Sequence, residues 1–243
     1  MTCELLTLEL DHARVPSARA ILQRPDSGGS ERGHAILLAH GAGASMEHPF
    51  MESMATGLAA RGFTVMRFEY PYMARARLEE RRLPPDRLPA LADAQRRALA
   101  LFRDHTAGLP IIMAGKSMGG RLSTLLAAGA VAAPTAKPQE PVTCAGLILF
   151  GYPLHPAGKP ERLRVDHFPH LHTPALFLQG TRDALCDLAL LRNSLKEYAG
   201  RATVEIIDGA DHGFSVPKRV GRSQEEVREH LLNSAVAWIA GLD

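Results

Sequence analysis

The sequence has little of what marks a secreted, membrane-spanning or disulfide-stabilised protein. It contains only three cysteines, Cys3, Cys144 and Cys186, an odd number without C-x-x-C spacing. This usage favours free thiols in a reducing compartment over a disulfide framework. No basic segment followed by an apolar one opens the chain, and no apolar run approaches the roughly 20 residues that span a bilayer. We therefore expect a cytoplasmic protein with no membrane partner.

A strong charge of either sign is also missing. The 28 Lys and Arg residues nearly balance the 26 Asp and Glu residues, for a formal net charge of +2. This balance argues against a dedicated nucleic-acid partner. With 46% hydrophobic and 22% charged residues, the composition is that of a globular protein. No internal repeat, low-complexity tract or flexible linker divides the sequence, which predicts a single domain over residues 1–243.

Strand-like and helix-like segments alternate from residue 35 to the end of the chain. This order predicts an α/β fold with a mostly parallel central sheet and helices on both faces. The apolar run at 35–39 is typical of a central strand that is buried on both sides. Further strands are expected at 63–70, 110–114, 145–150, 175–179 and 203–207, an edge hairpin at 4–10 and 18–24, an irregular segment at 71–87, and helices ending near 61, at 88–105, after 119, at 185–199 and at 224–240.

The segment 115–119, Gly-Lys-Ser-Met-Gly, lies between an apolar run and a helix-like stretch. A strand, a small-x-Ser-x-small turn and a helix are the parts of a nucleophile elbow. The serine sits on a strained turn, and glycines at both flanks avoid collisions with the neighbouring strand and helix. The pattern predicts Ser117 as a nucleophile, although a chance βα turn would carry the same letters.

The same letters also resemble the end of a phosphate-binding P-loop, G-x-x-x-x-G-K-[ST]. That loop needs a glycine at the position of Pro110, and proline has no N–H to offer a phosphate. Residues 111–114 are apolar and indicate a buried strand instead of an open loop. Nucleotide binding is therefore the weaker interpretation.

A serine hydroxyl needs an adjacent base, and the base needs a group that orients it. Asp183 follows the expected strand at 175–179, and His212 follows the expected strand at 203–207. The carboxyl ends of parallel strands meet at one edge of the sheet, where active sites of this architecture lie. The chain order serine, aspartate, histidine is that of an α/β hydrolase. We predict His212 as the base and Asp183 as the orienting acid, with Asp187 as a rival and Asp208 and Asp211 as turn residues.

An oxyanion hole needs two backbone donors close to the nucleophile. We expect one to be the N–H of Met118, directly after the serine. The other is expected in the turn at 40–43, most plainly the N–H of Ala42. His40 in that turn is interpreted as a brace for the loop and not as a catalytic base.

The chain resembles a small α/β hydrolase over nearly its whole length. The motifs that carry the resemblance are 38–43 (Leu-Ala-His-Gly-Ala-Gly), 115–120 (Gly-Lys-Ser-Met-Gly-Gly) and 209–212 (Gly-Ala-Asp-His). The segments 68–72 and 151–159 are similar to a branch of predicted hydrolases related to dienelactone-hydrolase-like proteins. Dienelactone hydrolases carry a cysteine nucleophile. The serine in this chain implies a serine hydrolase of ordinary small carboxylic esters or thioesters, which needs no cofactor.

The interval between the strands at 145–150 and 175–179 is too short for a helical lid. We expect a lidless, open cleft shaped by Tyr72, Tyr152 and Phe214. The histidine-rich segment 166–172 is interpreted as a surface connection, so no metal site is predicted. The alternative function is a protein-interaction module on a hydrolase scaffold, because a fold does not fix a function. The sequence does not determine the oligomeric state.

Overall fold

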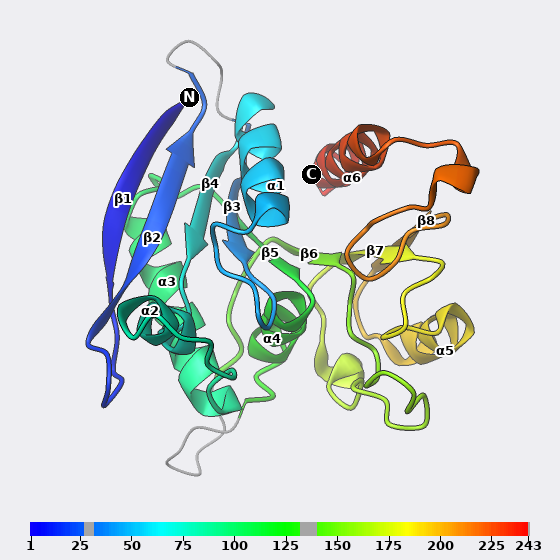
Figure 1. Cartoon of the computed structure of the whole chain (residues 1–243), viewed down its shortest axis with the longest axis horizontal. Helices are drawn as coiled ribbons and strands as arrows, with labels where there is room; N and C mark the ends of the chain where they lie inside the picture. The colour runs from blue at the N-terminus through cyan, green and yellow to red at the C-terminus, as the bar shows by residue number, and fades with distance from the viewer. Residues whose placement is uncertain (27–31, 132–139, 243) are drawn as a thin grey trace.

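The computed structural model describes residues 1–26, 32–131 and 140–242. Within them, eight strands form one sheet in the order β1-β2-β4-β3-β5-β6-β7-β8, from left to right in Figure 1. β1 pairs with β2 and β2 with β4 antiparallel, and all other neighbours are parallel. The mostly parallel sheet and the antiparallel edge hairpin are therefore confirmed. The strands are β1 (Thr2–Glu9), β2 (Ser17–Arg24), β3 (Ala35–Ala39), β4 (Thr64–Phe68), β5 (Ile111–Lys116), β6 (Gly146–Phe150), β7 (Ala175–Gly180) and β8 (Ala202–Ile207).

Helices cover both faces of the sheet (Figure 1). On one face, α1 and α6 pack on side chains such as Ile36 and Leu38 of β3. On the other face, α2 to α5 contribute to a second apolar cluster that includes Leu37. β3 is buried at all five positions because both of its faces are covered. The helices are α1 (Pro49–Ala60), α2 (Pro71–Leu78), α3 (Leu88–Asp104), α4 (Met118–Ala127), α5 (Leu188–Ser194) and α6 (Gln224–Ile239), with 3-10 turns η1 (Phe168–His170), η2 (Leu195–Glu197) and η3 (Lys218–Val220).

Two sequence predictions of local structure are wrong. Residues 71–78 form helix α2 instead of irregular chain. Pro71 occupies the first turn of that helix, where a missing N–H and a fixed φ are tolerated. The helix expected at 185–199 is the shorter α5 followed by η2. Its start is delayed because the Asp187 carboxylate caps the N-terminus by accepting the Leu190 N–H.

The segment 151–174 between β6 and β7 contains only the short turn η1. The prediction of a fold without a lid domain is therefore confirmed. Among the described residues, no helix has the length and apolar character that a transmembrane span requires.

Candidate active site

Ser117 lies on the turn between β5 and α4 in a strained backbone conformation. Its φ is 51° and its ψ is −113°, outside the regions that a residue with a side chain normally adopts. A Cβ on Gly119 would lie 2.5 Å from the backbone oxygen of Ala39, and one on Gly115 would lie 2.4 Å from the Gly120 nitrogen. Only glycine fits at these two flanks. Residues 111–116 form a buried strand and not an open loop of amide donors, which excludes the P-loop geometry.

The structure brings together Ser117, His212 and Asp183 from three separate loops. The His212 Nε2 atom lies 2.9 Å from Ser117 Oγ, and its Nδ1 atom lies 2.8 Å from Asp183 Oδ2. The carboxylate is an acceptor, so the ring proton resides on Nδ1 and the lone pair of Nε2 faces the serine hydroxyl. The three side chains thus form one continuous chain of hydrogen bonds that leads from the carboxylate to the hydroxyl.

The Asp183 carboxylate is buried and accepts three hydrogen bonds, one of them from His212. Its Oδ1 atom accepts the Leu185 N–H at 2.8 Å, and its Oδ2 atom also accepts Gln179 Nε2–H at 2.6 Å. The Oε1 atom of Gln179 accepts the Tyr152 N–H at 2.9 Å, which fixes the orientation of the amide. Sequence reasoning missed Gln179. The only signal for it is a polar residue at the end of an otherwise apolar strand.

The other carboxylates near these loops bind local groups. Asp187 caps α5 through Leu190. Asp211 Oδ1 accepts two N–H groups of its own turn. Asp208 Oδ1 accepts the Thr181 hydroxyl. Each therefore has the turn or capping contacts that such residues usually make, and Asp183 is the carboxylate that contacts the histidine ring.

The turn at 40–43 is held from inside the protein. The Gly41 carbonyl accepts His40 Nδ1–H at 2.9 Å and the Tyr72 hydroxyl at 3.2 Å, while His40 Nε2 accepts the Tyr70 N–H at 3.2 Å. Burial lowers the pKa of His40 to about 4, so the ring is neutral near pH 7 and can both donate and accept. The peptide bond between Gly41 and Ala42 is trans. Because the carbonyl points inward, the Ala42 N–H points in the opposite direction.

The turn at 40–43 also borders the serine. A Cβ on Gly41 would lie 3.5 Å from the Ser117 Cβ. Met118 follows the serine as the first residue of α4, where helix geometry offers no carbonyl to its N–H. The two expected oxyanion donors, on Ala42 and Met118, therefore belong to two backbone segments that both adjoin Ser117.

A buried polar chain connects the turn at 40–43 with the helix that follows the serine. Tyr70, whose N–H contacts His40, donates its hydroxyl to Gln95 Oε1 at 2.6 Å. Gln95 Nε2–H donates to Ser123 Oγ at 2.7 Å, and that hydroxyl donates to the Gly119 carbonyl at 3.0 Å. Buried polar groups that are all satisfied fix one arrangement of the surrounding backbone. Sequence reasoning did not find Gln95 or Ser123.

A family model for the alpha/beta hydrolase domain matches residues 32–240. The chain belongs to the α/β-hydrolase family. Solved structures with similar folds include XC6422 from Xanthomonas campestris, described as an a/b serine hydrolase without lid. The TM-score to it is 0.71 at 20% identity, over 97% of this chain and 94% of that one.

Two further structures resemble this α/β hydrolase. Dienelactone hydrolase from Anabaena variabilis has a TM-score of 0.64 at 21% identity, over 94% of this chain and 95% of that one. The propionate-bound esterase 2 of Thermogutta terrifontis has a TM-score of 0.70 at 20% identity, over 99% of this chain and 94% of that one. At these identities the structural likeness shows the fold, and the resemblance to lidless hydrolases read from the sequence motifs is confirmed.

Two of the three expected pocket residues lie inside this α/β hydrolase and not at its surface. Tyr72 and Tyr152 have no exposed area. The Tyr72 hydroxyl donates to Gly41 and the Tyr152 hydroxyl to the Arg164 carbonyl. Neither side chain presents a surface to a substrate. The prediction that Tyr72 and Tyr152 line the pocket is therefore wrong. A tyrosine close to a motif in the sequence can donate a hydrogen bond to a backbone carbonyl of the loop instead of lining the cleft.

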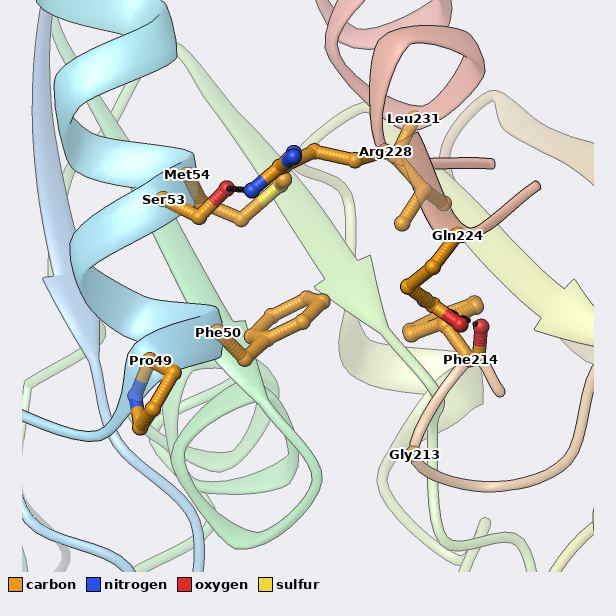
Figure 2. A pocket seen from close by; sticks show the side chains of 9 residues that line it. All are labelled: Pro49, Phe50, Ser53, Met54, Gly213, Phe214, Gln224, Arg228 and Leu231. Carbon is orange, nitrogen blue, oxygen red and sulfur yellow. Dashed lines mark hydrogen bonds between the residues drawn. The ribbon is translucent and has the colours of Figure 1, made fainter. Parts of the chain in front are cut away.

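The third expected pocket residue, Phe214, lines a cavity of about 170 Å³ between α1, α6 and the loop at 213–214 (Figure 2). The Phe50 and Phe214 rings are stacked, with their centroids 5.7 Å apart. Arg228 donates to Ser53 Oγ at 3.1 Å across the same cavity. Its lining is mainly apolar and includes Gly213, the residue after His212. The residues that line the cavity are Pro49, Phe50, Ser53, Met54, Gly213, Phe214, Gln224, Arg228 and Leu231.

A second cavity, of about 520 Å³, borders Gly43 and Ser45 at the end of the turn at 40–43 and is lined by arginines of α2 and the segment after it. Glu69 lies buried beside it and accepts hydrogen bonds from Arg19 and Arg77. Burial alone would raise the pKa of Glu69, but the hydrogen bonds from these arginines outweigh it and lower that pKa. Across the described ranges, no three His, Cys, Asp or Glu side chains gather as metal ligands.

Proposed function

We propose that this α/β hydrolase cleaves small carboxylic esters or thioesters through an acyl-enzyme on Ser117. The observation that carries the proposal is the hydrogen-bonded chain from Asp183 through His212 to Ser117, at 2.8 and 2.9 Å. A serine hydroxyl is a weak nucleophile unless a base takes its proton as it attacks. The ring proton on Nδ1 leaves the Nε2 lone pair in place for that task.

In acylation, Ser117 Oγ attacks the ester carbonyl carbon while its proton passes to His212 Nε2. The resulting imidazolium is stabilised by the Asp183 carboxylate, which stays ionised. When the tetrahedral intermediate collapses, the bond to the alcohol oxygen breaks and His212 returns the proton to that oxygen. The products of this half-reaction are a free alcohol and an acyl ester on Ser117.

In deacylation, a water molecule gives its proton to His212 and its oxygen attacks the acyl carbonyl. Collapse of the second intermediate returns the proton to Ser117 Oγ and releases the carboxylic acid. In both steps the negative charge on the carbonyl oxygen would be held by the N–H groups of Met118 and Ala42. Loss of one such donor typically lowers turnover by about 10²–10³.

Small substrates fit this site best because 151–174 supplies no lid over it. Esterase 2 of Thermogutta terrifontis, with a similar fold, is described as phosphorylated by paraoxon. That description supports testing this chain with organophosphorus probes.

The test is labelling by a fluorophosphonate probe together with hydrolysis of p-nitrophenyl acetate. We expect wild type to be labelled, and Ser117→Ala to lose labelling and about 10⁴–10⁶ in kcat/KM. Ser215→Ala, which removes an exposed hydroxyl from the histidine loop, is the matched control and should keep full activity. If wild type shows neither labelling nor turnover above Ser117→Ala, the proposal fails and the alternative of an interaction module is favoured.

A further inference from the structure

Lys116 directly precedes the serine and continues one face of β5. Residues alternate between faces along a strand, so Lys116 follows Ile112 and Ala114 on the face that α1 and α6 cover. Its partner across the sheet is Phe150 of β6. A lysine thus occupies the last position of a row that is otherwise apolar.

The ammonium of Lys116 reaches the loop that carries the expected base. Nζ–H donates to the backbone carbonyl of His212 at 2.5 Å. Nζ also lies 5.3 Å from the Phe214 ring centroid and 5.9 Å from that of Phe50, within range of a cation–π attraction. Lys116 is therefore joined to the histidine loop, the segment 208–216 that carries His212, by a charge-assisted hydrogen bond and by a contact with the Phe214 ring.

Gly151, directly after β6, shows how closely the charged groups converge. A Cβ built on Gly151 would lie 3.0 Å from Lys116 Nζ, 3.4 Å from His212 Nδ1 and 3.5 Å from Asp183 Oδ2. The ammonium, the imidazole and the carboxylate thus surround a single backbone position. Glycine leaves that position open.

Burial disfavours the charged form of Lys116 at this position. Burial lowers the pKa of Lys116 to about 8, although the negative charges of Asp183 and Asp211 oppose the shift. Among the described residues, no carboxylate lies within ion-pair distance of Nζ. A partly buried ammonium without an ion pair, held beside a hydrogen-bonded Asp–His–Ser chain, is typical of a functional site more than of a core.

We propose that Lys116 is a positioning residue that sets the place of the His212 imidazole through the His212 carbonyl. The proposal rests on the proposed function. Ser117 Oγ contacts the His212 side chain, and Lys116 Nζ contacts its backbone, so two consecutive residues of the elbow hold one residue of a distant loop. Without the lysine contact, the imidazole keeps its side-chain partners, but its backbone moves relative to the serine.

The test uses Lys116→Met, which keeps the aliphatic length and removes the donor and the charge. We expect kcat for p-nitrophenyl acetate to fall by about 10- to 100-fold, because a misplaced catalytic group costs up to about 10²-fold. KM should stay within threefold, since no substrate contact is lost. Hydrogen exchange of peptide 208–216 should become at least tenfold faster. Lys218→Met, which replaces an exposed lysine further along the chain, is the matched control and should leave kcat, KM and the exchange rate unchanged.

Lys116→Gln is a second variant, with an amide that is one atom too short to reach the same carbonyl. It guards against a folding failure of Lys116→Met. If both variants keep kcat within threefold and leave the exchange of 208–216 unchanged, the proposal is overturned. A lower melting temperature with unchanged kcat would assign Lys116 a purely structural role and also overturn it. Because exchange is measured without substrate, an inert wild type would refute the proposed function and still leave the contact testable.

Discussion

Replacement of Asp183 by Asn tests the direction of the hydrogen bonds around the histidine. The carboxylate has three donors: the Leu185 N–H on Oδ1, and His212 Nδ1–H and Gln179 Nε2–H on Oδ2. An asparagine supplies one oxygen and one NH2 group. If its oxygen keeps the Leu185 N–H, its NH2 group faces two donors. A rotated Gln179 would relieve one of these contacts, but its NH2 would then face the Tyr152 N–H.

The consequence for catalysis follows from the tautomer. Facing an NH2 group, the imidazole is favoured with its proton on Nε2, where it cannot accept the proton of Ser117. The same change in a serine protease lowers kcat by about 10⁴-fold, and we expect about 10³–10⁴ for Asp183→Asn. The donor that loses its acceptor would also destabilise the fold by about 1–3 kcal/mol. The variant should therefore remain folded and almost inactive.

The assay is kcat for p-nitrophenyl acetate, with stability measured by urea unfolding. Asp187→Asn is the matched control, because Asp187 only caps α5 and asparagine caps helices equally well. We expect it to keep activity within twofold. An Asp183→Asn enzyme with more than a tenth of wild-type kcat, or an equal loss in Asp187→Asn, would refute this assignment of the acid.

Three further predictions concern the supports of the site. Tyr72→Phe removes one of two donors to the Gly41 carbonyl, so kcat should fall about 3- to 10-fold at constant KM, at a cost of about 1 kcal/mol in unfolding free energy; an unchanged kcat would contradict this. Gly119→Ala places a Cβ 2.5 Å from a backbone oxygen of β3, so fluorophosphonate labelling should drop at least 100-fold, with about 3 kcal/mol lost; normal labelling would show that the elbow is not rigid. Glu69 has a lowered pKa, so its stabilisation is present above pH 4.5, near its unfolded pKa, and is lost as pH falls through its folded pKa. Urea unfolding should show Glu69→Gln weakening the protein at pH 6 more than at pH 3, and an equal effect at both would contradict the sign.

The sequence predicted the sheet and the approach of Ser117, His212 and Asp183 because both depend on residue type. Continuous apolar runs such as β3 need cover on two faces, which only helices on both sides supply. The elbow glycines are fixed by collisions that any Cβ would cause. The start of α2 at Pro71 was missed because proline both ends helices and opens them, and tertiary packing decides between the two.

The supporting residues were not predictable in the same way. Gln179 orients Asp183, and Gln95 joins Tyr70 to Ser123. Each acts through one donor and one acceptor, which many polar side chains could supply at the right place. Nothing in the sequence marks which buried amide meets which partner, because the partners lie on different elements. The sequence likewise does not predict that the hydroxyls of Tyr72 and Tyr152 donate to backbone carbonyls instead of facing a cleft.

Lys116 has one feature that the sequence predicts and one that it does not. Its face on β5 follows from simple alternation with Ile112 and Ala114, so its burial among apolar groups was accessible from the sequence. Its partner is a backbone carbonyl 96 residues away, and no side-chain pattern encodes a carbonyl. Because the lysine stands next to the serine, the letters Gly-Lys-Ser point toward phosphate binding, whereas the strand directs the ammonium to the histidine loop. The reason for a lysine at position 116 is therefore its contact with the His212 carbonyl, which depends on the approach of the loops after β5 and β8 in the folded protein.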